Sequence, residues 1–199
     1  RGRFTPGTGT TWGVLLQDSP GAIVESSAIC GVDGDVGAGI RVTGDATGTV
    51  IRSNLINAWG GAMDSHGMWL EDCGGAAPWI VDNFYVAAAG DSVLTRVDGI
   101  RSIGDCHPVI DSNLQITGGG EGGTTGANGV YCGASAAGTA SRCAVLGNLR
   151  IEGSDFGFPP TAVGVRCDDG GCLRIEQNTI PGRGGVNSWG IYLGASGTF

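Results

Sequence analysis

Two ladders of residues recur along this chain at a nearly constant spacing. The first is a ladder of seven glycines, each followed by an aliphatic residue, at Gly13, Gly39, Gly67, Gly99, Gly129, Gly164 and Gly190. A second ladder lies between these steps, and each of its members follows an aliphatic residue by three positions: Ser27, Asn54, Asn83, Asn113, Asn148 and Asn178. Neighbouring members of either ladder are 26 to 35 residues apart. One supersecondary unit repeated about six times at this period is the signature of a solenoid.

The hydrophobic period inside each unit is two residues. After a ladder glycine such as Gly39, the first and third residues are apolar (Ile40 and Val42) and the second is not. This alternation predicts a short strand with one buried face. No stretch of the chain shows a convincing helical period, and Gly, Asn, Asp and Ser separate the strands. The pattern therefore predicts an all-β fold built from the coils of a parallel β-helix.

The repeated pattern Gly-Ile/Val-x-x, loop, Ile-x-x-Asn-x-Ile/Leu resembles the right-handed parallel β-helix proteins. That superfamily includes pectate lyases, polygalacturonases, tail-spikes and many bacterial surface proteins, and the resemblance covers about residues 12–194. It implies a single-stranded right-handed parallel β-helix (solenoid) of about six to seven coils. We expect one domain over residues 1–199, belonging to a longer secreted chain. The architecture hosts lyases, hydrolases, adhesins and structural stalks, so it does not define the activity.

Seven cysteines indicate an oxidising compartment, and hence an extracellular or cell-surface location. Two close pairs, Cys132–Cys143 and Cys167–Cys172, each join the end of one expected strand to the start of the next. Cys73 and Cys106 stand at nearly equivalent positions of adjacent coils, about 4.8 Å apart, which a disulfide accepts. The alternatives are a stacked Cys132–Cys167 pair, or a metal site, although no standard zinc spacing is present. Cys30 is left as a free thiol or as a link to another chain.

The charge and hydropathy of the chain exclude two classes of partner. The formal net charge is −8, all eleven basic residues are arginine, and no basic block occurs. Such a chain is not expected to bind nucleic acid. No apolar stretch approaches the roughly 20 residues that a membrane-spanning helix needs.

An outward-facing row follows from the strand pattern. The second residue after each ladder glycine points away from the core, which places in one row Leu15, Arg41, Trp69, Arg101, Tyr131, Arg166 and Tyr192. Arginine alternates with an aromatic residue, so like residues recur about every 9.6 Å at a strand spacing of ~4.8 Å. Aromatic rings stack on sugars and arginine binds carboxylate or sulfate, so the row is a candidate binding site for an acidic polysaccharide.

A structural role for the same row is the alternative. Stacked arginines and aromatic rings stabilise one another by cation–π contacts. The glycines beside them would form a strip without side chains, or would serve a bend that needs a positive φ. The asparagine ladder is expected to be scaffold, with the asparagines at a bend that tolerates the left-handed conformation.

Evidence for catalysis is weaker. A polysaccharide lyase needs a basic residue and carboxylates that hold Ca²⁺, and the best cluster is Arg101 with Asp72 and Asp98, near Glu71 and Asp105. The motifs of polygalacturonase-like hydrolases are present only as fragments, in Asp168-Asp169, Ser65-His66-Gly67 and Arg174-Ile175-Glu176. No metal ligands and no cofactor are expected otherwise.

The sequence thus favours a noncatalytic extracellular module that binds polysaccharide or other copies of itself end to end, as a filament. A Ca²⁺-dependent polysaccharide lyase is the alternative, followed by a glycoside hydrolase.

Overall fold

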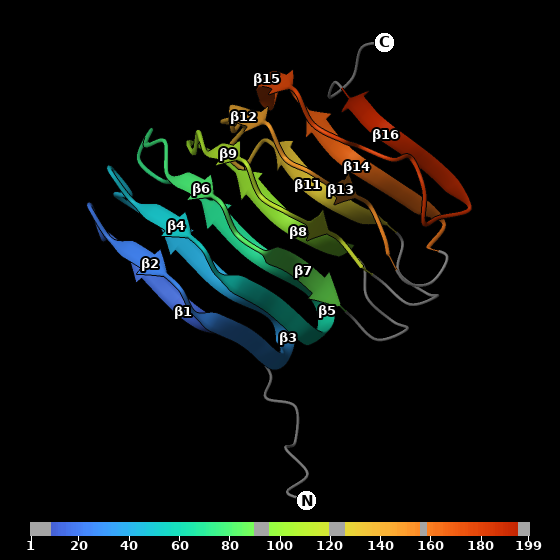
Figure 1. Ribbon diagram of the computed structural model, residues 1–199. Coiled ribbons are helices and arrows are strands. Elements are labelled where there is room, and N and C mark those ends of the chain that lie inside the picture. Colours follow the sequence, from blue (N-terminus) through green and yellow to red (C-terminus); the bar gives the residue numbers. More distant parts are fainter. Residues whose placement is uncertain (1–8, 90–95, 120–125, 156–158, 195–199) are drawn as a thin grey trace, which may run out of the picture.

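The computed structural model describes residues 9–89, 96–119, 126–155 and 159–194. These residues form a parallel β-solenoid of about six turns and contain no helix (Figure 1). The strands are β1 (Thr10–Gln17), β2 (Ile23–Glu25), β3 (Ala28–Thr43), β4 (Val50–Arg52), β5 (Leu55–Glu71), β6 (Trp79–Val81), β7 (Tyr85–Ala89), β8 (Arg96–Ile103), β9 (Val109–Asp111), β10 (Ile116–Thr117), β11 (Ala127–Gly133), β12 (Cys143–Leu146), β13 (Ile151–Glu152), β14 (Thr161–Asp168), β15 (Cys172–Glu176) and β16 (Asn187–Gly194).

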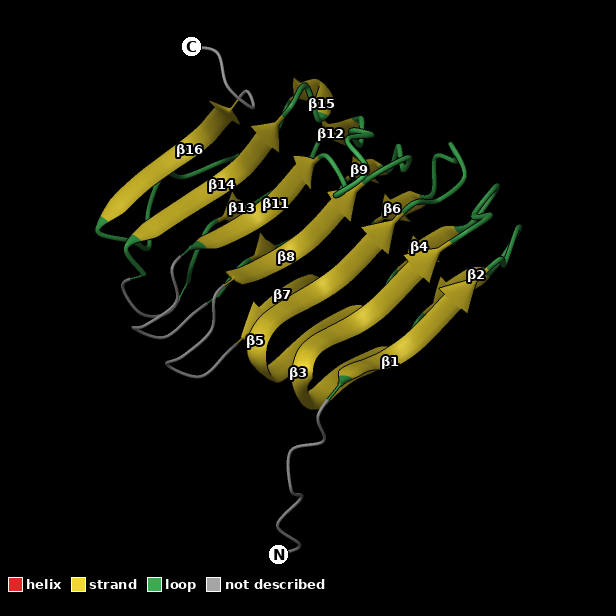
Figure 2. Ribbon diagram, turned by 180° about the vertical axis from the view of Figure 1, so that it is seen from behind, coloured by secondary structure: helices red, strands yellow, loops and turns green. Residues whose placement is uncertain are grey.

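The strands stack into two parallel sheets. The smaller sheet has the order β15-β12-β9-β6-β4-β2. The larger sheet has two arms: the first arm contains β7, β10 and β13, and the second arm contains β1, β8, β11, β14 and β16. Strands β3 and β5 run through both arms, since the start of β5 pairs with β7 and its end pairs with β8. Figure 2 shows the second arm side by side along the solenoid axis.

One continuous core fills the space between the stacks. Its members come from the inward positions that the two-residue period predicts, for example Ile40 and Val42 on the second arm, which are 0% and 1% exposed. Three positions before the first four ladder asparagines stand Ile51, Ile80, Ile110 and Val145, which are fully buried in the same cluster, and Ile175 before Asn178 is partly buried against it. The predicted repeat and its inward pattern are therefore confirmed.

The ladder glycines serve close packing, and the expected reasons for them were wrong. None of the seven has a positive φ. A Cβ on Gly99 would lie 2.6 Å from the carbonyl oxygen of Gly129 on the next coil and 2.9 Å from Cγ2 of Ile116, which is fully buried. The missing side chain thus allows the backbone to approach the interior. It does not leave a bare strip beside the outward row.

The asparagine ladder forms a chain of hydrogen bonds along the axis. The backbone N–H of Asn83 donates to Oδ1 of Asn113 at 3.0 Å, and Nδ2 of Asn83 donates to the same oxygen at 2.8 Å and to the carbonyl of Ile51 at 3.0 Å. The same contacts recur from Asn54 to Asn178. The left-handed residue is the one before each asparagine, such as Ser112 at φ 53°, and not the asparagine itself. That part of the prediction was wrong, because the asparagine side chain needs its own backbone extended to reach the next coil.

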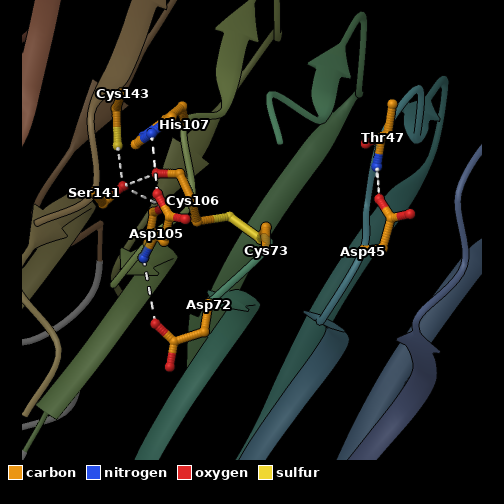
Figure 3. Close-up of a disulfide and its surroundings, with 10 residues drawn as sticks. Asp45, Thr47, Asp72, Cys73, Asp105, Cys106, His107, Ser141 and Cys143 are labelled. Carbon is orange, nitrogen blue, oxygen red and sulfur yellow. Dashed lines mark hydrogen bonds and ion pairs between the residues drawn. A yellow bond between two sulfur atoms is a disulfide. The ribbon is translucent and has the colours of Figure 1, made fainter. Parts of the chain in front are cut away.

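The three predicted disulfides are present. Cys132–Cys143 and Cys167–Cys172 each connect the second arm to the smaller sheet, and Cys73–Cys106 joins equivalent turns of adjacent coils (Figure 3). Cys132 and Cys167 are in register as neighbours but do not pair with each other. Cys30 is exposed and free. Disulfides of this number are typical of a protein that folds in an oxidising compartment.

Candidate functional site

The outward row lies on the second arm in the predicted register. We call it the Arg/aromatic strip and define it by Arg41, Trp69, Arg101, Tyr131, Arg166 and Tyr192. Each member pairs with the next across adjacent strands from β3 to β16, and Leu15 precedes it on β1. The strand alternation therefore brings six side chains from six coils into one line.

Within the strip the guanidinium groups stack on the rings. The Cζ atom of Arg41 lies 4.2 Å from the Trp69 ring centroid, and Cζ of Arg101 lies 4.7 Å from that of Tyr131. Cζ of Arg166 lies 5.2 Å from the Tyr192 ring. The stacking expected from the alternative structural role is thus real, and it stabilises the row by about 0.5–1 kcal/mol per exposed pair.

Each arginine of the strip also contacts a carboxylate. Arg41 donates to Glu71 at 2.8 Å, and Arg166 donates to Asp168 at 2.9 Å. The arginine side chains are more exposed at the β16 end than in the middle of the strip: that of Arg101 is 13% exposed, whereas that of Arg166 is 36% exposed. The middle of the strip is therefore covered by its own packing, and its β16 end is open to solvent.

Two hydrogen-bond donors of the strip lack an acceptor. Nε of Arg41 and Nε1 of Trp69 are buried and have no hydrogen-bond partner in the described residues. A buried donor without an acceptor costs about 1–3 kcal/mol, so an incoming oxygen atom that reached these groups would recover that energy.

A buried polar cluster lies beside the strip, around Asp98 of β8. Oδ1 of Asp98 accepts a hydrogen bond from Nδ2 of Asn128 at 2.7 Å, and Oδ2 accepts one from Nη1 of Arg101 at 3.2 Å. Nδ1 of His66 lies 3.4 Å from Oδ2, outside hydrogen-bonding geometry. His66 and Asp98 are 1% and 0% exposed. Sequence reasoning grouped Arg101 with Asp98 but missed that His66 and Asn128 belong to the same cluster.

The charges of this cluster follow from burial and from its arginines. Burial alone would raise the pKa of Asp98, but its contacts with His66 and the positive charges of Arg101 and Arg96 lower that pKa to about 2. Burial lowers the pKa of His66, and the neighbouring Asp98 offsets only part of that effect. At neutral pH the cluster therefore holds an ionised carboxylate, a neutral imidazole and a cationic Arg101.

The residues of the lyase alternative do not converge. Asp98 contacts Arg101, and it pairs with His66 of β5. Asp72 lies in the turn after β5, six residues beyond His66, which is about 20 Å along the strand direction. Oδ1 of Asp72 accepts a hydrogen bond from the backbone N–H of Asp105 at 3.3 Å, as Figure 3 shows. Glu71 contacts Arg41 instead. Asp72 therefore has a turn-forming role beside the Cys73–Cys106 disulfide.

The fragments that resemble hydrolase motifs are also separated. His66 is buried with Asp98, Asp168 pairs with Arg166, and Arg174 pairs with Glu176 on the smaller sheet. Within the described residues, no group of three His, Cys, Asp or Glu side chains lies close enough to hold a metal ion. Across the same residues, no helix is long and apolar enough to cross a membrane.

A second polar cluster, which the sequence analysis did not identify, lies on the first arm. Glu152 of β13 is fully buried and accepts hydrogen bonds from Arg150 at 2.9 Å, Arg183 at 3.1 Å and Gln115 at 3.2 Å. Burial raises the pKa of Glu152, against the effect of the arginines. A groove of about 520 Å³ adjoins the cluster and is lined by Leu114, Gln115, Leu149, Arg150, Thr179, Pro181 and Arg183.

The comparisons with known proteins leave the function to be argued from this geometry. No family model, no curated protein and no solved structure matches the chain.

Proposed function

We propose that this chain is a noncatalytic extracellular module that binds acidic polysaccharide through the Arg/aromatic strip. We further propose that it is a right-handed β-helix of the pectate-lyase-like superfamily and of bacterial origin, as the repeat pattern suggests. The observation that carries the binding proposal is the alignment of alternating arginine and aromatic side chains over six consecutive coils.

The spacing along the strip supports a polymeric ligand. Arginines recur on every second coil, about 9.6 Å apart at a strand spacing of ~4.8 Å, which is close to the repeat of a disaccharide. Each guanidinium can bind a carboxylate or sulfate group, and the rings between them offer apolar faces to sugars. A linear acidic polysaccharide can therefore run parallel to the solenoid axis and contact successive coils.

The polymer would meet the strip first at its β16 end. Arg166 and Tyr192 are each 36% exposed, and they retain accessible surface despite their contact with each other. Farther along the strip the unpartnered donors of Arg41 and Trp69 are buried, so a ligand oxygen reaches them only when these side chains move. Binding at exposed arginines is screened by salt, so we expect retention to fall as ionic strength rises.

The test compares two arginines in matched settings. Arg166 on the strip pairs with Asp168, and Arg174 on the smaller sheet pairs with Glu176, in each case two residues along the chain. We expect Arg166→Gln to weaken binding to polygalacturonate by about two- to fivefold, as for an exposed charge. Arg174→Gln should leave that binding unchanged. Trp69→Phe keeps a ring but removes the indole donor, and it should also weaken binding.

Equal effects of Arg166→Gln and Arg174→Gln would contradict a specific strip and leave only general electrostatics. The same mixtures, supplied with Ca²⁺ and followed by ultraviolet absorbance, test the lyase alternative. Formation of an unsaturated product would show that the noncatalytic assignment is wrong.

We also propose end-to-end self-association. The inward positions of β16 continue the core row of β14, with Ile191 next to Val165 and Leu193 next to Cys167. Ile191 and Leu193 are nonetheless 47% and 60% exposed. A further coil from a second copy would bury them in a head-to-tail contact that can propagate. Electron microscopy of the purified chain over a range of concentrations should show filaments, and single particles throughout would refute this proposal.

A further inference from the structure

An apolar row runs along the first arm, on a different face from the Arg/aromatic strip. The residue that directly follows a ladder asparagine is large and apolar on four consecutive coils, and we call this the apolar row: Leu55, Phe84, Leu114 and Leu149. Their exposed fractions are 46%, 59%, 49% and 60%. Scattered exposed leucines are ordinary on a protein surface, whereas a contiguous line of them marks a binding surface.

The hydrogen bonds of the backbone make this row straight and rigid. The N–H of Phe84 donates to the carbonyl of Asn54, that of Leu114 donates to Asn83, and that of Leu149 donates to Asn113, each at 2.9 Å. The row is therefore fixed to the buried asparagine ladder, with a rise of ~4.8 Å per coil. Its rigid shape complements a thin and linear apolar ligand.

The groove lies at one end of the row and is cationic at its surface. Leu114 and Leu149 belong to both the row and the groove, and among the described residues the charged ones that line the groove are Arg150 and Arg183. Their side chains are 39% and 58% exposed, whereas their carboxylate partner Glu152 is 0% exposed. The solvent-facing charge of the groove is thus positive, although the chain as a whole carries −8.

The arginines keep donors for a ligand. In the described residues, Arg183 contacts Glu152 through Nε, and Arg150 contacts it through Nη2. The remaining guanidinium nitrogens can donate to an anionic group, and the Glu152 carboxylate holds both side chains at the groove. The second carboxylate nearby, Asp155, accepts a hydrogen bond from the hydroxyl of Tyr85 at 3.2 Å.

We propose that the groove and the apolar row bind a single-chain anionic amphiphile of the fatty-acid class. Its carboxylate contacts Arg150 and Arg183, and its alkyl chain lies along Leu149, Leu114 and Phe84. This site is independent of the polysaccharide strip, because it lies on the other arm of the sheet and shares no residue with it. Each methylene group buried against the row should raise the affinity by about fourfold, so affinity should rise with chain length.

The experiment titrates the whole chain with sodium decanoate below its micelle concentration, by calorimetry and by amide NMR shifts. Octanoate tests the effect of chain length, and decyltrimethylammonium presents the same tail with the opposite charge. We expect decanoate to bind more tightly than octanoate. We expect the cationic analogue not to bind, and the shifts to cluster at residues 114–115, 149–150 and 179–183.

Matched variants separate the site from general surface effects. Leu149→Ser and Arg183→Gln should each weaken decanoate binding by about fivefold or more, given the apolar area and the charged hydrogen bond removed. Leu173→Ser and Arg174→Gln change residues of similar exposure on β15, outside the groove, and should have no effect.

Three results would overturn the proposal. Equal binding of the cationic analogue would remove the role of the arginines. Equal losses in the β15 control variants would show that the binding is nonspecific. A dimer in light scattering that Leu149→Ser dissociates, and that decanoate does not, would show that the row is covered by a second copy of the chain.

Discussion

The asparagine ladder makes a quantitative prediction at Asn113, which lies in the middle of the stack. Its side chain makes five hydrogen-bonding contacts: the two N–H groups of Nδ2 are shared among oxygens of Ile80, Asp111 and Asn148, and Oδ1 accepts two hydrogen bonds from Asn83. Asn113 is completely buried, so water cannot replace these partners. We therefore expect Asn113→Ala to be among the most destabilising single substitutions in any coil.

The expected loss in the free energy of unfolding follows from the groups that the truncation leaves without a partner. The backbone N–H of Asn83 loses its acceptor in a buried site, at a cost of about 2 kcal/mol, and the other bonds together contribute about 2 kcal/mol more. The expected loss is thus about 4 kcal/mol, a large part of the ~5–15 kcal/mol by which a typical protein is stable. Asn113→Asp retains the shape but places a carboxylate against Oδ1 of Asn148, so it should cost at least as much.

The assay is urea unfolding in the absence of reductant, followed by circular dichroism and analysed by linear extrapolation. The matched control is Asn178→Ala, at the half-exposed end of the same ladder, where the truncation itself opens the site to water. Its cost should be about 1 kcal/mol. If Asn113→Ala and Asn178→Ala cost the same, the ladder does not derive its strength from burial, and the reasoning fails.

Three further predictions concern pH, a turn and the free thiol. The pKa values of Asp98 and His66 are lowered in the folded protein, so the unfolded chain binds protons more readily. The free energy of unfolding should therefore fall as pH drops below about 6.5, through His66, and fall again between about pH 4 and 2, through Asp98. Denaturant titrations of Asp98→Asn should lose the lower step, and persistence of that step would refute the assignment. Gly104→Ala should lower the melting temperature more than Gly138→Ala. Both glycines have a positive φ, but only at Gly104 would the new Cβ meet a side-chain oxygen of the preceding coil. Equal melting temperatures would contradict this prediction. Labelling of the native oxidised protein should modify one thiol, Cys30, and a second equivalent would show that a disulfide is open.

The sequence was sufficient to predict the repeat, the register and the disulfides, because each depends on residues that recur at equivalent positions. The Arg/aromatic strip was predictable for the same reason, because a two-residue period predicts which side chains point away from the core. Asp98 shows the limit of that rule. It precedes a ladder glycine and lies outside the run of residues that the pattern describes, so the sequence did not show that it is buried with His66 and Asn128.

The groove on the first arm could not be predicted, because its parts come from segments with different periods. Arg183 lies in an irregular connection after the last ladder asparagine, and no spacing relates it to Glu152. The apolar row was present in the sequence as the residue after four of the five ladder asparagines. Its exposure could not be inferred, since a leucine beside a turn fits either the core or the surface.

The coils contain unequal numbers of residues, and this bears on how a molecule with this fold can gain residues or coils. Successive ladder residues, from Ser27 to Asn178, are separated by 27, 29, 30, 35 and 30 residues, yet the hydrogen bonds between them keep nearly the same lengths. Extra residues are therefore absorbed in the connections and do not disturb the stack. Duplication of a whole coil would lengthen the molecule by a fixed step of ~4.8 Å and would extend every surface row by one position. The number of coils therefore sets the length of a binding surface, and one residue in each coil sets its chemistry.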